Sequence, residues 1–429
     1  MQTSEFDPYA GNLLVQGLGP ILSPMERLAQ LTTRPPVPPA IDGIPRHVRV
    51  HMLQTLRDLY IPSPESARIA ETIDLMVRQG YRYRDPRRAT TWTIVGNDPA
   101  AARLPRAPGL TSLVAGHSGC GKSNAILRWF GCYPQQIITH ETFPRLVGNH
   151  AQVVWLSVDV PASGRLVHLA RNLMMTWDDA LARSVEGYMP RFTNALVRER
   201  SDGAKLFDEW LRVACSHFLG ILHLDEIQNF FKLPTLAQRK TGRTRKSEVN
   251  DVELSLVEDQ MLRAVLTLVN TWEIPVIVSG TPDGATALLK RLSNAQRFAA
   301  SGFHRLEEFR SVDDRKFQLF LTSLGQYQFL NKRLAIDDTV RSVVLELTAG
   351  VPRLIVALWL AAQRLALERT DDTFRIEDLR RASKTLLGSV APAVAALRSG
   401  DPTKMRQYED LLPRDDAFWN SFWAGGTTT

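Results

Sequence analysis

A glycine-rich run combines a flexible backbone with a lysine and a hydroxyl. Residues Gly116 to Ser123 read Gly-His-Ser-Gly-Cys-Gly-Lys-Ser and match the pattern G-x-x-x-x-G-K-S/T at every fixed position. Glycines let backbone N–H groups curl around phosphate oxygens, and a helix that follows turns its positive end toward the anion. We expect Lys122 to reach the β- and γ-phosphates of ATP and the Ser123 hydroxyl to bind Mg²⁺. The predicted nucleotide contacts are Gly116, Ser118, Gly119, Cys120, Gly121, Lys122, Ser123 and Asn124.

Two adjacent acids follow an apolar stretch further along the chain. Residues Leu219 to Leu224 read as a buried strand, and Asp225 and Glu226 come directly after it. Functional groups of parallel sheets gather at the carboxyl ends of the strands, so both carboxylates should face the phosphate loop. We expect Asp225 to hold Mg²⁺ and Glu226 to act as general base toward the attacking water.

Further groups can be assigned to the same nucleotide. The predicted strand Pro275 to Ser279 is followed by Thr281, and either Thr281 or, as second choice, Ser279 would bond the γ-phosphate or the water. Arg353, at the start of a later helix, would touch the nucleotide from a second domain. The alternatives are a structural threonine at a strand end and a solvated arginine near a helix start.

A positive group supplied by a neighbouring subunit would stabilise the charge of the transition state. Arg291, Arg297 and Arg305 cluster after the Pro275 to Ser279 strand, and we choose Arg297. The alternative is that all three are surface charges.

A basic segment follows the acids. Residues 232–246 contain basic and small polar residues and no acid, which is typical of a mobile loop that contacts phosphates without reading bases. A formal net charge of +7 and a pI near 9.4 also favour a polyanionic partner. A solvated charged face is the alternative. The candidate DNA-binding residues are Lys232, Arg239, Lys240, Arg243, Arg245 and Lys246.

The cysteines do not indicate a disulfide framework. Cys120, Cys132 and Cys215 are scattered and form no CxxC pair, which predicts a reducing, cytoplasmic environment. Cys120 lies within the phosphate loop, where it is either a redox switch or a small residue that fills a variable position. The first residues have no basic and apolar regions of a signal peptide, and no stretch is apolar for long enough to cross a bilayer, so no membrane partner is expected.

Strands and helices alternate through the middle of the chain, which predicts an α/β fold with a parallel sheet. An amphipathic helix begins after Ser63 and is expected to end at Gly80. Strands are expected at 113–115, 136–138, 153–158, 219–224 and 275–279, with helices at 45–59, 123–130, 164–180, 202–217 and 257–271. From Asp313 to Leu386 the pattern is only helical. We expect an extended N-terminal arm at 1–59, an ATPase domain at 60–310, a helical lid at 311–388 and a C-terminal tail for partner docking at 389–429.

The order of these motifs resembles the TnsC/TniB AAA+ ATPases of bacterial transposons. The resemblance is carried by Tyr60-Ile61-Pro62-Ser63-Pro64, Asp225-Glu226-Ile227-Gln228-Asn229 and Ser279-Gly280-Thr281-Pro282. Residues 76–81 and 390–400 look like TnsC rather than the shorter TniB forms. The similarity covers residues 60–412, and it implies an AAA+ P-loop NTPase with a parallel sheet core and a small C-terminal helical lid.

The resemblance implies a bacterial, DNA-associated regulator of transposition. Members of the family bind ATP and Mg²⁺, assemble as rings or helical filaments around double-stranded DNA, and link a target selector of the TnsD or TniQ type to the transposase. ATP hydrolysis disassembles them. The matching positions are Lys122, Ser123, Asp225, Glu226, Thr281 and Arg297, and Tyr60 and Ile61 fall where the N-terminal segment of the family approaches the adenine.

Two departures from the family are visible. The basic loop after Asp225 and Glu226 is longer than expected, and the chain stops earlier than long TnsC forms. Trp419 and Trp423 would either form a docking segment or cover the helical lid. Competing functions with the same ATP chemistry are a helicase loader or replication initiator, and a signalling NTPase that binds no DNA.

Overall fold

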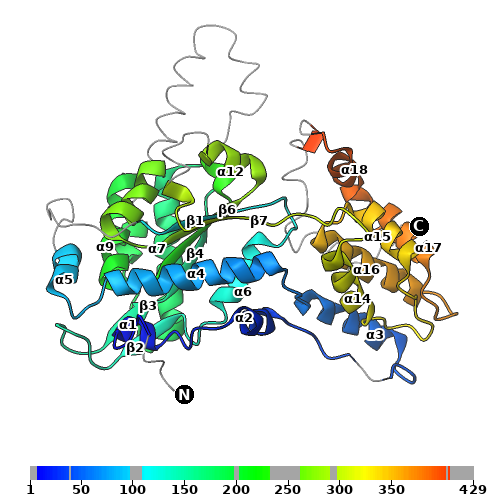
Figure 1. Cartoon of the computed structure of the whole chain (residues 1–429), viewed down its shortest axis with the longest axis horizontal. Coiled ribbons are helices and arrows are strands. Elements are labelled where there is room, and N and C mark those ends of the chain that lie inside the picture. The colour runs from blue at the N-terminus through cyan, green and yellow to red at the C-terminus, as the bar shows by residue number, and fades with distance from the viewer. Residues whose placement is uncertain are drawn as a thin grey trace, which may run out of the picture. The chain divides into compact units, whose positions relative to one another are not determined.

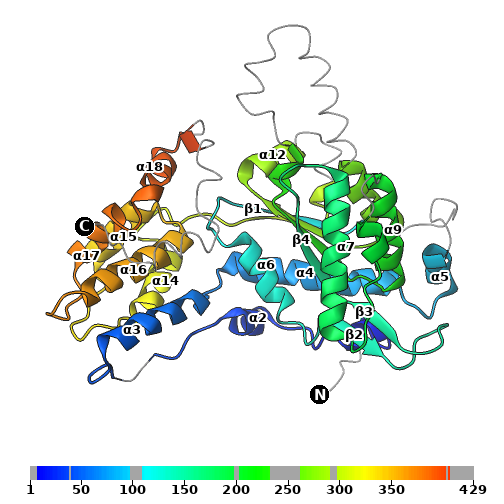
Figure 2. The same cartoon turned by 180° about the vertical axis from the view of Figure 1, so that it is seen from behind.

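The computed structural model divides the chain into two units, each with its own hydrophobic core (Figures 1 and 2). Unit 1 holds the described residues of Met1–Arg27, Ser66–Ala115 and Ser123–Arg305, and unit 2 those of Leu28–Glu65, Gly116–Lys122 and Leu306–Thr429. The segment predicted as an N-terminal arm is therefore shared between the units. The structure describes residues 7–37, 40–96, 109–197, 202–231, 261–289, 297–401 and 404–405.

Unit 1 is built on a parallel sheet of five strands in the order β4-β5-β6-β1-β7. Strands β1, β5 and β6 are buried at every position, as strands covered by helices on both faces must be. The predicted α/β class with a parallel sheet core is confirmed. The strand bounds are Thr111–Ala115 for β1, Trp155–Asp159 for β4, Ile221–Asp225 for β5, Val276–Gly280 for β6 and Gly302–Arg305 for β7.

The strand predicted at residues 153–158 is confirmed from Trp155 onward, but it does not continue through Val154, where the chain changes sheets. Strand β3 (His150–Val153) pairs antiparallel with β2 (Ile137–His140), and β4 begins only at Trp155. The N–H of Val154 donates to the carbonyl of Gln136 at 2.8 Å, while its own carbonyl accepts from Ile221 at 3.1 Å. Val154 thus bonds to both sheets, and an apolar run alone does not reveal such a crossing.

Helices cover both faces of the large sheet. Figure 1 shows α4 (Pro64–Tyr83) crossing in front of the strands, and Figure 2 shows α7 (Leu166–Ser184) in front of β4 on the opposite side. Residues 261–272 are helical as well. The remaining helices of this unit are α1 (Leu13–Gln16), α5 (Ala89–Gly96), α6 (Lys122–Phe130), α8 (Thr193–Leu196), α9 (Gly203–Ser216), η2 (Ile227–Phe231) and α12 (Pro282–Leu289).

Gly80 does not end its helix as predicted, because α4 continues to Tyr83. A Cβ added at Gly80 would lie 2.7 Å from Cγ of Pro275, directly before β6. The glycine therefore permits close packing of α4 against the start of a strand. Further toward the N-terminus of the helix, Thr72 bonds His304 of β7 at 3.0 Å.

Unit 2 is helical, which confirms the expectation for residues 313–386. Its central helix α16 (Pro352–Leu367) is apolar around most of its circumference because it is buried among the others. Aspartates cap two of its neighbours: Asp314 precedes α14 and Asp337 precedes α15. The other elements are α2 (Pro24–Leu31), which begins in unit 1, α3 (Arg46–Leu53), η1 (Gln54–Asp58), α14 (Arg315–Gly325), α15 (Asp338–Thr348), α17 (Ile376–Lys384), η3 (Gly388–Val390) and α18 (Ala391–Ser399).

The N-terminal segment of unit 2 packs against these helices. The hydroxyl of Tyr327 donates to the carbonyl of Pro35 at 2.9 Å, which fixes the chain at this point. The guanidinium of Arg49 in α3 forms a bidentate pair with Asp372 at 2.9 and 3.0 Å, and it also donates to the carbonyl of Phe329. Both partners are largely buried, so the pair gives α3 one orientation.

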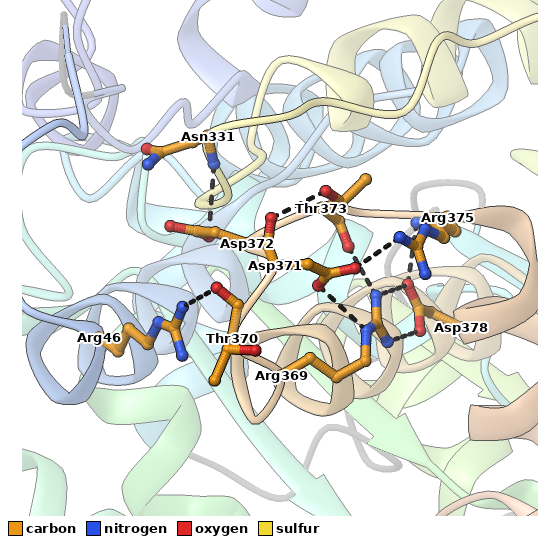
Figure 3. A network of polar contacts seen from close by, with 9 residues as sticks. All are labelled: Arg46, Asn331, Arg369, Thr370, Asp371, Asp372, Thr373, Arg375 and Asp378. Carbon is orange, nitrogen blue, oxygen red and sulfur yellow. Dashed lines mark hydrogen bonds and ion pairs between the residues drawn. The ribbon is translucent and has the colours of Figure 1, made fainter.

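The loop between α16 and α17 is held by a polar network (Figure 3). Arg369 pairs with Asp378 and with Asp371, and Asp371 also pairs with Arg375. The N–H of Arg375 donates to the same Asp378 at 2.9 Å, which closes the first turn of α17. The network keeps Asp372 and the carbonyl of Thr370 in place for Arg49 and Arg46 of helix α3.

In the described part of the chain, no helix taken singly has both the length and the apolar character to cross a membrane. Helices α15 and α16 meet that test only as a pair, and they are bent by 112° relative to each other.

Candidate nucleotide-binding site

The phosphate loop follows β1 and leads into α6, as the sequence predicts. Gly119 and Gly121 adopt positive φ angles of 86° and 92°, which glycine tolerates and other residues rarely adopt. A Cβ at Gly116 would lie 2.3 Å from the carbonyl oxygen of Leu306, whereas one at Gly121 would meet no heavy atom of the described residues within 4 Å. The loop therefore leaves open space beside Gly121, and α6 begins at the next residue, Lys122.

Within unit 2, the loop contacts residues that follow β7. The ammonium of Lys122 donates to the carbonyl of His117 at 3.2 Å, and Nδ1 of His117 lies 3.1 Å from a carboxylate oxygen of Glu308. The hydrogen bond from His117, opposed by burial, lowers the pKa of Glu308 to about 2. Arg353 reaches the loop with its backbone: its N–H donates to the carbonyl of Gly119 at 3.3 Å. The pairing of His117 with Glu308 was not predicted, since His117 occupies a variable position of the motif.

Within unit 1, the side chains of Ser123, Asp225 and Ser279 meet. The hydroxyl of Ser123 donates to Oδ2 of Asp225, and the hydroxyl of Ser279 donates to Oδ1 at 2.5 Å. The N–H of Glu226 donates to the same Oδ1 at 2.8 Å. The last residue of the motif and the acid at the end of β5 are thus brought together as predicted.

The donor set at this point suits Mg²⁺. The pKa of Asp225 lies below its usual value: burial favours the neutral acid, and the hydrogen bonds from Ser123, Ser279 and the main chain favour the ionised form. An ionised carboxylate beside a hydroxyl supplies the oxygen ligands that Mg²⁺ prefers. Within unit 1, Ser123 and Asp225 would hold the ion.

Glu226 has an unusual backbone conformation for its residue type. Its φ angle is 63°, which costs free energy for a residue with a Cβ and is often found at functional sites. Nε2 of Gln228 donates to one carboxylate oxygen of Glu226. Oε1 of the same Gln228 accepts from the N–H of Thr281 at 3.2 Å. Gln228 was noted in the sequence as part of a motif but was given no role, and only the fold shows its contacts.

The two candidate residues after β6 have different surroundings. Thr281 is 3% exposed, and its hydroxyl accepts from the N–H of Gly284 at 3.3 Å, at the start of α12. Ser279 bonds Asp225 directly. The assignment of Thr281 to the γ-phosphate or water stays a prediction, and Ser279 is the residue that contacts the proposed metal ligand.

Two of the three arginines considered for the role in a neighbouring subunit, Arg297 and Arg305, are exposed. Arg297 is exposed, and its backbone carbonyl accepts a hydrogen bond from the hydroxyl of Thr111. Arg305 ends β7, with its guanidinium 5.2 Å from the ring centre of Phe303. Arg291 lies outside the described residues. A role for Arg297 in a neighbouring subunit stays a prediction.

Other predicted positions divide between unit 2 and the part of the chain that is not described. Tyr60 pairs with Thr33 through backbone hydrogen bonds of 2.9 and 3.0 Å, and the adjacent Ile61 is half-buried, so their contact with adenine stays a prediction. Burial raises the pKa of the Cys120 thiol to about 12, which favours packing over a redox role. The basic segment 232–246, Trp419 and Trp423 lie outside the described residues.

No protein-family model matches the chain, and no curated protein matches it. The structure of the Aeropyrum pernix Orc1 protein in complex with DNA has a TM-score of 0.42 and 13% identity, over 84% of this chain and 76% of that one. A point mutant of Thermotoga maritima RuvB has a TM-score of 0.35 and 12% identity, over 77% and 72%. The Thermotoga maritima RuvB Holliday junction branch migration motor has a TM-score of 0.34 and 14% identity, over 74% of this chain and 68% of that one. Because each TM-score is below 0.5, these similarities carry no conclusion about the site.

Proposed function

We propose that this chain is an ATPase of the AAA+ kind. The observation that carries the proposal is the hydrogen bond between Ser123 and Asp225. It places the hydroxyl that ends the phosphate-loop motif on the carboxylate that ends a buried parallel strand. These are the two residue types and positions that a Mg²⁺–ATP site of the P-loop class requires.

The residues of the site would divide the work of hydrolysis. Backbone N–H groups of the loop and the ammonium of Lys122 bind the phosphates, and Ser123 and Asp225 orient the metal. Bound Mg²⁺ supplies positive charge beside the β- and γ-phosphates. Glu226 takes a proton from the attacking water as general base. Thr281 would orient the water or the γ-phosphate, and Arg297 would act on the nucleotide of a neighbouring subunit.

The finer function that we propose is regulation of DNA transposition. Its support is the resemblance of the motifs to TnsC, together with the net charge of +7 and the basic segment after the acids. In this proposal, ATP-bound copies assemble on double-stranded DNA as a ring or filament and connect a TnsD/TniQ-type target selector to the transposase. Hydrolysis releases the assembly.

A Glu226→Gln variant tests the ATPase. It keeps the shape of the base but removes its charge, so ATP binding should persist while turnover falls by at least about 100-fold. The matched control is Asp208→Asn, which removes an exposed carboxylate on α9 and should leave turnover unchanged. Hydrolysis at the wild-type rate by Glu226→Gln would remove Glu226 from the role of base.

Assembly is tested separately by sedimentation and electron microscopy with a duplex and a slowly hydrolysed ATP analogue. The proposal expects large particles only when both are present, and it expects Glu226→Gln to form the same particles with ATP itself. A chain that stays monomeric with excess analogue and duplex is no transposition regulator of this kind, even if it hydrolyses ATP.

A further inference from the structure

A line of polar side chains crosses three neighbouring strands of unit 1 and ends at Asp225. Oγ of Ser157 on β4 lies 2.8 Å from Nδ1 of His223 on β5, and Nε2 of the same ring lies 2.8 Å from Oγ of Ser279 on β6. Ser279 in turn donates to Asp225 at 2.5 Å. His223 and Ser279 are 0% exposed, so water does not compete for the bond between them or for the bond from Ser279 to Asp225, whereas Ser157 is half-buried.

With a neutral His223 ring, the bonds of this line take one consistent set of directions. An ionised Asp225 only accepts, so the single proton of Ser279 is used on Asp225. Ser279 must then accept from the Nε2–H of His223. A neutral imidazole with its proton on Nε2 accepts a hydrogen bond at Nδ1. The hydroxyl of Ser157 donates this bond.

We propose that His223 is a positioning residue for the metal site, which acts by orienting Ser279 and, through it, the Asp225 carboxylate. With Oδ1 held by Ser279 and the N–H of Glu226, the other oxygen, Oδ2, faces Ser123. This inference rests on the proposed function, because Ser123 and Asp225 are the metal ligands that it assigns. Partners behind a metal ligand fix its orientation, and their loss commonly weakens metal binding by about 10- to 100-fold.

An imidazole is an unusual choice at this position. The other residues of β5 before Asp225 are Ile221, Leu222 and Leu224, all 0% exposed. A buried polar ring costs free energy unless both nitrogens are paired, and here both are. The ring of Phe130 meets that of His223 edge-on at 6.2 Å between centres, which limits how far the imidazole can tilt. The site thus uses a buried histidine for the orientation of one serine hydroxyl.

Two amide substitutions separate positioning from packing. In His223→Gln the amide nitrogen occupies nearly the place of Nε2 and can still donate to Ser279. In His223→Asn the side chain is one carbon shorter and cannot. We expect Gln to keep the Mg²⁺ concentration for half-maximal ATP hydrolysis within about twofold of wild type, and Asn to raise it about tenfold. Ser279→Ala should raise it by about 10- to 100-fold.

The matched control is His304→Leu. His304 is also a buried histidine on a strand of the same sheet, but it bonds Thr72 rather than any residue at Asp225. It should lower the melting temperature without changing the Mg²⁺ requirement. A second measurement, Mn²⁺ binding followed by electron paramagnetic resonance with an ATP analogue present, reports metal affinity without turnover and should rank the variants in the same order.

The outcomes separate the two claims. Suppose that wild-type hydrolysis needs Mg²⁺, and that His223→Asn has the same Mg²⁺ requirement but a lower melting temperature. Then His223 is a packing residue, and the positioning proposal is overturned. If the wild-type chain binds no ATP and no metal, the proposed function itself fails. The proposal is supported if the Mg²⁺ requirement is raised in His223→Asn and stays near the wild-type value in His223→Gln.

Discussion

Gln228 connects Glu226, the proposed general base, to the neighbouring strand. Its Nε2 donates to the carboxylate of Glu226, and its Oε1 accepts from the N–H of Thr281 at 3.2 Å. Two glycines make room for it: a Cβ at Gly280 would lie 2.7 Å from Oε1, and one at Gly284 would lie 2.9 Å from Cα of Gln228. The half-buried amide therefore packs against both glycines, and it links the Glu226 carboxylate to the turn between β6 and α12.

We predict that Gln228→Ala lowers the rate of hydrolysis more than it weakens ATP binding. Without the amide, the Glu226 side chain samples more orientations, and a misplacement of about 1 Å can cost about 100-fold in rate. We expect kcat to fall by about 10- to 100-fold and KM for ATP to change little, because Gln228 contacts neither the phosphate loop nor Asp225 in the described contacts. Steady-state ATPase kinetics measure both constants.

Asn229→Ala is the matched control for this variant. It removes an amide from the same short helix, η2, but that amide donates to the carbonyl of Val160 at 2.8 Å and not to Glu226. Its kcat should stay near wild type. An equal loss of kcat in both variants would show that η2 matters only as a folded turn.

We predict that Gly80→Ala destabilises the protein although alanine favours helices. The gain in helix propensity is about 1 kcal/mol, but the new methyl group would approach Pro275 to 2.7 Å and force α4 away from the sheet. Overpacking of this kind costs about 1–3 kcal/mol, so the urea midpoint should fall. Gly96→Ala in α5 is the control, because a Cβ at this position would meet none of the described residues within 4 Å. This variant should not lower the urea midpoint. A higher midpoint for Gly80→Ala would contradict the packing role.

Glu308 should give the protein a pH-dependent stability. Its pKa falls from 4.5 to about 2 on folding, chiefly through the hydrogen bond from His117, so the charged form is favoured in the folded state. That stability is complete above pH 4.5 and is lost as the pH falls through about 2. At pH 6, Glu308→Gln should therefore have a lower melting temperature than wild type, and this difference in melting temperature should narrow as the pH falls below 4.5. Glu307→Gln, which removes an exposed neighbouring carboxylate, should have the melting temperature of wild type throughout this pH range.

The sequence predicted those parts of the site whose residue types are required by chemistry. Ser123 and Asp225 were identified from fixed motif positions. Strand β1, which precedes the loop that ends at Ser123, and strand β5, which ends at Asp225, were identified from short apolar runs. It could not predict contacts made by residues at variable positions, such as His117 with Glu308 or Gln228 with Thr281, because these depend on which segments the fold brings together. Strand β7 was missed for the same kind of reason. Only His304 of its four residues is buried, so it shows no apolar run.

We predict that the basic segment supplies most of the DNA affinity. Each phosphate that a protein neutralises contributes about −0.9 to the slope of log K against log salt concentration. Changing five basic residues to glutamine should weaken duplex binding and reduce the size of this slope by up to about 4.5. Fluorescence anisotropy of a labelled duplex at several salt concentrations, with ATP analogue present, measures both quantities. The residues are Arg239, Lys240, Arg243, Arg245 and Lys246.

The control for this variant must remove the same charge elsewhere, because any loss of net charge weakens attraction to DNA over a distance. A second variant therefore neutralises five exposed basic residues of unit 2, which are Lys332, Arg333, Arg380, Arg381 and Lys384. It should lose some affinity for DNA at low salt. Near physiological salt it should keep the wild-type slope, because exposed charges more than about 8 Å apart are largely screened there. If both variants lower the slope equally, binding depends on total charge. In that case the segment after Glu226 is an ordinary solvated surface, and the DNA contacts must be made by another part of the chain.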